Sequence, residues 1–486
     1  MLTKKINILL VLILLFGFFL RIYNINNTLG FYYDQGRDAL RIWDLWHKFD
    51  FFLIGPTTGI AGIFRGPFYY YLIAPFYLIG KGNPVWPSIF LSITTVIAIF
   101  LGFFLGKKIH SNTAGIIMAT LSAFSFNIVM ASRWLSNPTP MLLLSLLLVF
   151  FMLMVSENKK GGWYGISIVL GLSLFSFGSS GEVFYFLTVA VFAIFQRKKL
   201  PNKKDLLIVL LLFLLTVLPQ IIFELKNNFL LSKNVFNFLI NERSFRPTTW
   251  AVILEKIEFY KNVFGGLIFH GPSSKDKFIL DTVLILIVIY FRKLIKLKGV
   301  KILLLLLGPM MIGLLFFQGN EGNFYDYYLT GYYLIFLLFF SIGLGEIWKK
   351  NFLVKMSVIF FLYLFLINNF TVLRFKLSDK VEGPGSIALK TELQAVNYIK
   401  ENGIDKEFNV DVYVPPVIPF AYDYLFKWKN VIQSDKQVPL LYTLYEGQPA
   451  ESERLTLWLE RQEGIGKVIE SVSFGGITVQ KRTRID

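Results

Sequence analysis

Residues 191–223 read VFAIFQRKKLPNKKDLLIVLLLFLLTVLPQIIF, in which a cluster of lysine and arginine separates two long apolar runs. Apolar runs of about 20 residues are long enough to cross the hydrocarbon of a bilayer. Because basic residues near the ends of such runs stay on the cytoplasmic side, this pattern predicts a polytopic α-helical membrane protein and its orientation. The same alternation recurs along the chain, with further basic clusters at 4–5, 107–108, 159–160, 292–301 and 349–355.

The composition agrees with this fold class. The mean hydropathy is +0.56, and of the 486 residues 55% are hydrophobic and 17% are charged. The net charge of +17 does not indicate nucleic acid, because residues 1–375 carry 35 basic and 16 acidic side chains and residues 376–486 carry 14 and 16. The excess lies mostly in short loops, where it orients the protein and faces anionic lipid. There is no cysteine, which excludes disulfides and thiolate sites.

Eleven spans are predicted, with the amino terminus inside. Residues 64–79, FRGPFYYYLIAPFYLI, are apolar enough to cross as well, but a span there would move every later basic cluster outside. We therefore expect this segment to lie on or dip into the outer leaflet. The predicted spans are 6–23, 85–106, 113–131, 141–156, 163–178, 183–196, 206–223, 278–292, 302–317, 329–347 and 353–372. The outer segments are then 24–84, 132–140, 179–182, 224–277, 318–328 and 373–486.

A shift in composition near Arg374 predicts a domain boundary. Residues 1–375 form the membrane domain, and residues 376–486 form a small α/β domain on the outer face. Alternation and helical periodicity predict helices at 391–401 and 451–462 and strands at 408–414 and 476–480.

The first outer segment, 24–84, opens with FYYDQGRDAL at residues 31–40. Residues 37–49 are predicted to form an amphipathic helix on the membrane surface, whose apolar face carries Ala39, Ile42, Trp43, Trp46 and Phe49. Asp34 comes just before it. The carboxylate is either the N-cap of this helix or a partly desolvated general base.

Four other places in the outer segments carry candidate binding residues. Arg65 is either a snorkelling interfacial arginine or a bidentate donor to a phosphate. Glu182 is either solvated in a short turn or a site residue, because ionisable groups at membrane depth are costly. Tyr325 and Asp326 are either interfacial residues or ligands for sugar hydroxyls. Arg133 ends the third span, where an interfacial anchor is the simplest interpretation.

Metal and nucleotide motifs do not appear in the sequence. The three histidines, His47, His110 and His270, lie in different loops with no HExxH spacing. There is also no Walker loop and no Rossmann glycine motif, so a cytosolic nucleotide sugar is not the expected donor.

The chain resembles the GT-C superfamily of membrane glycosyltransferases over roughly residues 1–350. The resemblance rests on the inside amino terminus followed by a long outer loop with an early aspartate, on GPFYYY at 66–71 and on ASRWLSNP at 131–138. The most similar branch is family 39, the protein O-mannosyltransferases and the aminoarabinose transferases, in particular its uncharacterised bacterial members.

This resemblance implies roles for particular residues. The family's catalytic aspartate corresponds to Asp34, with Asp38 as the second choice. The family's acidic pair is broken here by Gln35, which leaves the involvement of a divalent cation open. The family's His-Pro-Pro-Leu-Tyr-Tyr stretch corresponds to residues 65–70, which include Arg65 and Tyr69. Arg133 corresponds to a Ser-Arg element and would hold a phosphate.

The resemblance also implies a function. It is inverting transfer of a hexosyl or pentosyl unit from a polyprenyl-phosphate donor to an acceptor hydroxyl, at the outer face of the cytoplasmic membrane. The acceptor stays open between protein, lipid and glycan, and no cofactor is required with certainty. A transporter or flippase of a lipid-linked glycan is the main alternative. A scaffold with a binding tail and a GT-C enzyme that joins oligosaccharides are further alternatives.

Overall fold

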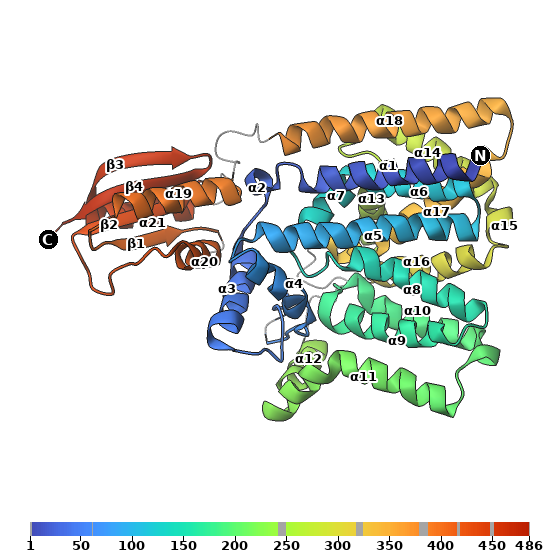
Figure 1. Ribbon diagram of the computed structural model, residues 1–486, viewed down its shortest axis with the longest axis horizontal. Helices are drawn as coiled ribbons and strands as arrows, with labels where there is room; N and C mark the ends of the chain where they lie inside the picture. Colours follow the sequence, from blue (N-terminus) through green and yellow to red (C-terminus); the bar gives the residue numbers. More distant parts are fainter. Residues whose placement is uncertain are drawn as a thin grey trace.

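The computed structural model describes residues 2–60, 62–241, 249–316, 324–378, 387–415, 418–447 and 452–485. These residues form a bundle of helices with a smaller domain of strands and helices at one end (Figure 1).

All eleven predicted spans are helical. Within the described ranges, six helices are long and apolar enough to cross a membrane: α1 (Leu2–Ile22), α5 (Val85–Ile109), α11 (Lys203–Lys226), α16 (Lys298–Phe316), α17 (Thr330–Trp348) and α18 (Phe352–Leu377). The bent pair α6 (Asn112–Phe124) and α7 (Phe126–Arg133) adds a seventh. The other four segments are shorter helices, so their crossing stays a prediction: α8 (Met141–Ser156), α9 (Gly161–Leu172), α10 (Phe184–Phe195) and α14 (Ser274–Ile289).

The basic clusters gather at the end of the bundle that is opposite the small domain. The amino terminus and α15 (Phe291–Leu294) both lie there in Figure 1. Lys108 pairs with Glu157 at 2.8 Å, and Lys160 pairs with Asp205 at 3.2 Å, so ion pairs join successive connections at this end. This distribution is the one that the positive-inside bias predicts.

The third predicted span is not straight, because it breaks at Ser125 and its two halves bend by 60°. The backbone amide of Phe126, which begins α7, donates to Oδ1 of Asn369 at 2.7 Å. Asn369 is fully buried in α18. Because a buried amide is costly without a partner, this side chain stabilises the bend. A second irregularity is the π-helical turn η1 (Ser173–Phe177), which ends α9.

The surface helices start and end differently from the prediction. Helix α3 (Tyr33–Lys48) begins early, so Asp34 lies inside its first turn and Tyr32 takes the N-cap position. The interpretation of Asp34 as the N-cap is therefore wrong. Phe49, expected on the apolar face, is 74% exposed because it ends the helix in a left-handed conformation (φ 55°).

Two outer segments also contain helices. Residues 68–79 of the segment 64–79 form α4 (Phe68–Ile79), an apolar helix as short as α10, so the placement of this segment in the outer leaflet stays a prediction. The segment 224–277, expected as an outer loop, contains α12 (Leu230–Asn241) and α13 (Trp250–Gly266). Residues 267–269, which follow α13, are fully buried, so this segment enters the bundle and is not simply a loop.

The small domain contains a four-stranded sheet in the order β1-β2-β4-β3. Strand β1 is parallel to β2, and the other pairs are antiparallel. The two predicted helices and two predicted strands are present, whereas α20, β2 and β3 were not predicted. The elements are α19 (Leu389–Asn402), β1 (Asn409–Tyr413), α20 (Phe420–Lys429), β2 (Leu440–Glu446), α21 (Ser452–Ile465), β3 (Gly466–Phe474) and β4 (Ile477–Arg484).

The small domain docks on the beginning of α3 through α20. Gly36 allows this close approach, because an added Cβ would lie 2.3 Å from the backbone nitrogen of Ala421. The indole of Trp428 donates to the carbonyl of Lys81 at 2.8 Å. These contacts hold the small domain over the loop that begins α3.

Candidate functional site

An ion-paired cluster occupies the first two turns of α3. Nη1 of Arg37 lies 2.7 Å from Oδ1 of Asp34. Its Nε and Nη2 donate to Oδ1 of Asp38 at 2.9 and 2.8 Å, and its Nη1 also donates to Thr57 at 2.8 Å. Arg37 thus holds both candidate carboxylates, one on each side, and fixes their orientation.

The two carboxylates have opposite environments. The side chain of Asp34 is 59% exposed, and that of Asp38 is 6% exposed. The hydroxyl of Tyr70, on α4, donates to Oδ1 of Asp38 at 2.9 Å. Burial raises the pKa of Asp38 to about 6, against the opposing charge of Arg37. Only Asp34 is therefore placed to meet a substrate, and Asp38 contacts the protein.

Arg65 is positioned by backbone hydrogen bonds on both of its sides. Its amide donates to the carbonyl of Pro56 at 2.9 Å, and the next amide, of Gly66, donates to the carbonyl of Phe175 in η1 at 2.6 Å. The guanidinium makes no hydrogen bond or ion pair within the described part of the chain. Burial lowers the pKa of Arg65, and the charge of Glu182 opposes this. Arg65 is thus a half-buried cation available to an anion.

Glu182, in η2 (Gly181–Val183), is fully buried and contacts backbone rather than solvent. Oε1 accepts from the amide of Gly331 at 2.7 Å, and Oε2 accepts from the amide of Ser179 at 2.5 Å. Gly331 lies in the first turn of α17, where helical amides have no partner within the helix. The carboxylate therefore caps α17, and the solvated alternative is wrong.

Arg133 is buried and uses its guanidinium at the end of α1. Nη1 donates to three carbonyls, those of Leu20, Arg21 and Tyr23, at 3.2, 3.0 and 2.9 Å. Nη2 donates to Thr28 at 2.6 Å. The last carbonyls of a helix lack partners within the helix, so Arg133 satisfies the end of α1. The structure thus gives this residue partners other than the predicted phosphate.

The aromatic candidates lie in two places. Tyr69, in α4, is fully buried and its hydroxyl has no partner among the described residues. Tyr325 is exposed and stacks on Tyr327 with ring centroids 5.4 Å apart. Asp326 begins η5 (Asp326–Leu329), is exposed, and accepts from the amide of Tyr327 at 2.8 Å.

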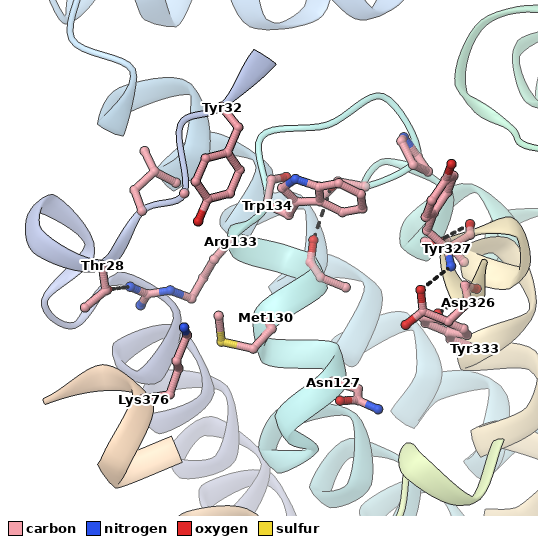
Figure 2. A pocket seen from close by; sticks show the side chains of 16 residues that line it. Thr28, Tyr32, Asn127, Met130, Arg133, Trp134, Asp326, Tyr327, Tyr333 and Lys376 are labelled. Atoms are coloured by element: carbon pink, nitrogen blue, oxygen red, sulfur yellow. Dashed lines mark hydrogen bonds between the residues drawn. The ribbon is translucent and has the colours of Figure 1, made fainter. Parts of the chain in front are cut away.

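A cavity of about 350 Å³ lies at this end of the bundle (Figure 2). Its walls come from the loop before α3, from α7 and the residues after it, from η5 with the start of α17, and from the end of α18. Asp326 lines it, and Arg133 lines it with its guanidinium engaged by α1. Asp34, Asp38 and Arg65 lie outside this lining.

The residues around Asp34 do not fit a metal ion. A divalent cation would need the space between the two carboxylates, and the guanidinium of Arg37 occupies that space. In the described ranges, no three histidine, aspartate or glutamate side chains gather in a way that would hold a metal ion. We therefore derive no step through a metal.

Sequence reasoning missed Arg37, Tyr70 and Trp134. Arg37 carried a signal, because an arginine at i+3 from Asp34 shares its helix face. Tyr70 lies in the same aromatic run as Tyr69, but only the packing of α4 on α3 shows that it contacts Asp38. Trp134 lies in the motif ASRWLSNP, which predicts no role for it, and only the structure shows that it lines the cavity.

The comparisons with known proteins cover the whole chain by structure and one third of it by sequence. Residues 65–223 match the family described as dolichyl-phosphate-mannose-protein mannosyltransferase. This range includes Arg65, Arg133 and Glu182 but not Asp34. No curated protein matches the sequence.

Three solved structures share the fold. ArnT from Cupriavidus metallidurans in the apo state has a TM-score of 0.64 and 11% identity, over 99% of this chain and 98% of that chain. The same protein bound to undecaprenyl phosphate has a TM-score of 0.61 and 12% identity, over the same shares. The Archaeoglobus fulgidus oligosaccharyltransferase with zinc and sulfate has a TM-score of 0.52 and 13% identity, over 95% of this chain and 71% of that chain.

Proposed function

We propose that this protein, which has the fold of the GT-C membrane glycosyltransferases, transfers a monosaccharide from a polyprenyl-phosphate donor to an acceptor hydroxyl. One observation carries the proposal. An exposed carboxylate, Asp34, is held in place by Arg37, which also donates to Thr57. Thr57 forms a β-bridge with Phe64, the residue before Arg65, and the guanidinium of Arg65 has no partner in the described residues. Such a transfer needs a base for the acceptor hydroxyl and a cation for the leaving phosphate.

The donor phosphate is assigned to Arg65. A guanidinium binds phosphate oxygens through two parallel hydrogen bonds, and the partial burial of Arg65 strengthens this attraction. ArnT, which shares the fold, has been solved with undecaprenyl phosphate, and this supports a polyprenyl phosphate as the carrier. Both a hexosyl and a pentosyl unit fit this assignment.

The transfer is a single displacement. Asp34 takes the proton of the acceptor hydroxyl while the hydroxyl oxygen forms a bond to the anomeric carbon. The bond between that carbon and the phosphate oxygen breaks, and the electron pair leaves with the polyprenyl phosphate. Arg65 stabilises the negative charge on the leaving phosphate. Attack from the face opposite the phosphate inverts the configuration, and no protein nucleophile takes part.

The reaction takes place at the outer face of the cytoplasmic membrane. Helix α3, which carries Asp34, helix α4, which follows Arg65, and the small domain lie at the end of the bundle opposite the basic clusters (Figure 1). The positive-inside bias assigns the basic end to the cytoplasm, with the amino terminus there and the small domain outside.

The test measures transfer of radiolabelled sugar from polyprenyl-phosphate donors to endogenous acceptors, in membranes that hold the native chain, Asp34→Asn or Asp50→Asn. Asp50 is a matched control, since it is an exposed carboxylate just after α3 whose nearest ion pair, with Arg41, is loose at 3.8 Å. Loss of the base lowers the rate by about 10²- to 10⁴-fold, so we expect this loss in Asp34→Asn and native transfer in Asp50→Asn.

Full transfer by Asp34→Asn would refute the role of this carboxylate. A transporter of a lipid-linked glycan needs no base, so unchanged translocation of the glycan in Asp34→Asn, together with no transfer by the native chain, would favour that alternative.

A further inference from the structure

The cavity lies beside the proposed centre but on the other side of an aromatic wall. Tyr32, Trp134 and Tyr327 follow one another along its upper edge in Figure 2. The rings of Trp134 and Tyr327 are 5.9 Å apart and meet edge to face. The proposed phosphate ligand, Arg65, does not line the cavity.

Two features place this wall next to the start of α3. Tyr32 precedes Asp34 by two residues at the start of α3. The side-chain amide of Gln35 donates to the carbonyl of Leu135, the residue after Trp134, at 3.1 Å. A molecule held against this wall therefore lies close to the start of α3, which carries the proposed base.

The charged groups of the cavity differ in how far they are already engaged. Arg133 lines it, but both terminal nitrogens of its guanidinium donate to the protein. Lys376 is exposed and makes no hydrogen bond or ion pair in the described ranges. Asp326 contributes a negative carboxylate, of which only Oδ1 has a partner, the amide of Tyr327. Two cations and one anion line the cavity. The two exposed side chains among them, Lys376 and Asp326, are opposite in sign, and both can bond to the hydroxyls of a polyhydroxylated molecule.

Shape and composition point to a sugar ring. The rings of Tyr32, Trp134 and Tyr327 offer apolar faces for the C–H groups of a pyranose. Asp326 and Asn127 supply hydrogen-bonding groups around it, the latter with Oδ1 2.9 Å from Nδ1 of His270. A volume of about 350 Å³ is within the range of small-molecule sites and holds one or two sugar units.

We propose that this cavity is the acceptor subsite, and that the acceptor is the hydroxyl of a pyranose rather than of a protein side chain. The inference rests on the proposed function, because it needs Asp34 as the base that serves this side. Trp134 is the specificity-determining platform, and Asp326 orients the ring. The hydroxyl that reaches past the wall loses its proton to Asp34 and gains the bond to the anomeric carbon.

The experiment measures binding without a donor, so it does not depend on turnover. Methyl glucoside, galactoside and mannoside are titrated against the full chain in nanodiscs, and their saturation-transfer NMR signals are followed. Native protein, Trp134→Ala, Asp326→Asn and Trp250→Ala are compared, since Trp250 is 71% exposed and lies outside the cavity. We expect saturable binding of at least one glycoside, weakened about tenfold by either cavity variant and unchanged in Trp250→Ala; tenfold corresponds to about 1.4 kcal/mol.

Three results would overturn the inference. One is the absence of saturable binding by any glycoside to folded native protein. Another is binding that survives both cavity variants. The third is competition, in which polyprenyl phosphate displaces a bound glycoside from native protein but not from Lys376→Met. That result would assign the cavity to the lipid phosphate. Failure of the proposed function would appear separately, as transfer that persists in Asp34→Asn.

Discussion

Replacing Arg133 with methionine separates its two roles, the phosphate ligand that the sequence motif implies and the helix cap that the structure shows. Methionine keeps much of the volume and removes the guanidinium. The carbonyls of Leu20, Arg21 and Tyr23 and the hydroxyl of Thr28 then lose their partner. An unsatisfied buried polar group costs about 1–3 kcal/mol, and part of this is recovered where water reaches the end of α1. We expect a net destabilisation of about 3 kcal/mol.

The assay is thermal unfolding in detergent, followed by intrinsic fluorescence, alongside the KM for the donor. An unfolding entropy of about 2 cal/mol/K per residue gives roughly 1 kcal/mol/K for this chain, so Tm falls by about 3 °C. Arg133→Lys keeps the positive charge but has one terminal nitrogen in place of two, so its Tm should fall by an intermediate amount. A native Tm in Arg133→Met together with a donor KM raised tenfold or more would refute the capping role and restore the phosphate assignment.

Three further predictions concern the centre and its support. Arg65→Ala should raise the KM for a polyprenyl-phosphate donor about tenfold or more, because the guanidinium is the proposed phosphate ligand. Its Tm should stay unchanged, because the guanidinium bonds to no other described residue; a lowered Tm or an unchanged KM would contradict this. Tyr70→Phe should move the acidic limb of the pH–rate profile upward from about pH 6. Protonation of Asp38 below its pKa of about 6 weakens its hold on Arg37, and the hydrogen bond from Tyr70 favours the ionised form; an unmoved limb would contradict this. Gly36→Ala should detach α20, because the added Cβ would lie 2.3 Å from Ala421; hydrogen exchange should rise in α20 and not in β4, and unchanged exchange would contradict the docking.

The helical architecture could be predicted because it depends on the local composition of each segment. A long apolar run between basic clusters forms a helix in a bilayer wherever it lies in the sequence. The exposure of Asp34 agrees with its expected place at the opening of the first outer segment, and its role as the base stays a prediction. The predicted helix 391–401 and strand 408–414 of the small domain also rest on local periodicity, and both are present as α19 and β1.

The remaining features depend on residues that are far apart in the sequence. Arg133 caps a helix that ends more than 100 residues earlier, so its motif alone points equally well to a phosphate. The bend at Ser125 is stabilised by Asn369 from α18, 243 residues after the amide that it accepts from. The hydrogen bond that Asp38 accepts comes from Tyr70, which lies in α4 rather than in α3. Local pattern carries none of these partners.

The shortness of α10 has a consequence for the bilayer itself. Its twelve residues rise about 18 Å, against a hydrocarbon layer of about 30 Å, and Phe186, Leu187, Ile194 and Phe195 are exposed along it. Such a hydrophobic mismatch costs a fraction of a kcal/mol per ångström, which the lipid meets by thinning locally. Because α10 begins two residues after Glu182, which caps α17, the predicted crossing of α10 would transmit the thickness of the surrounding membrane to this cap.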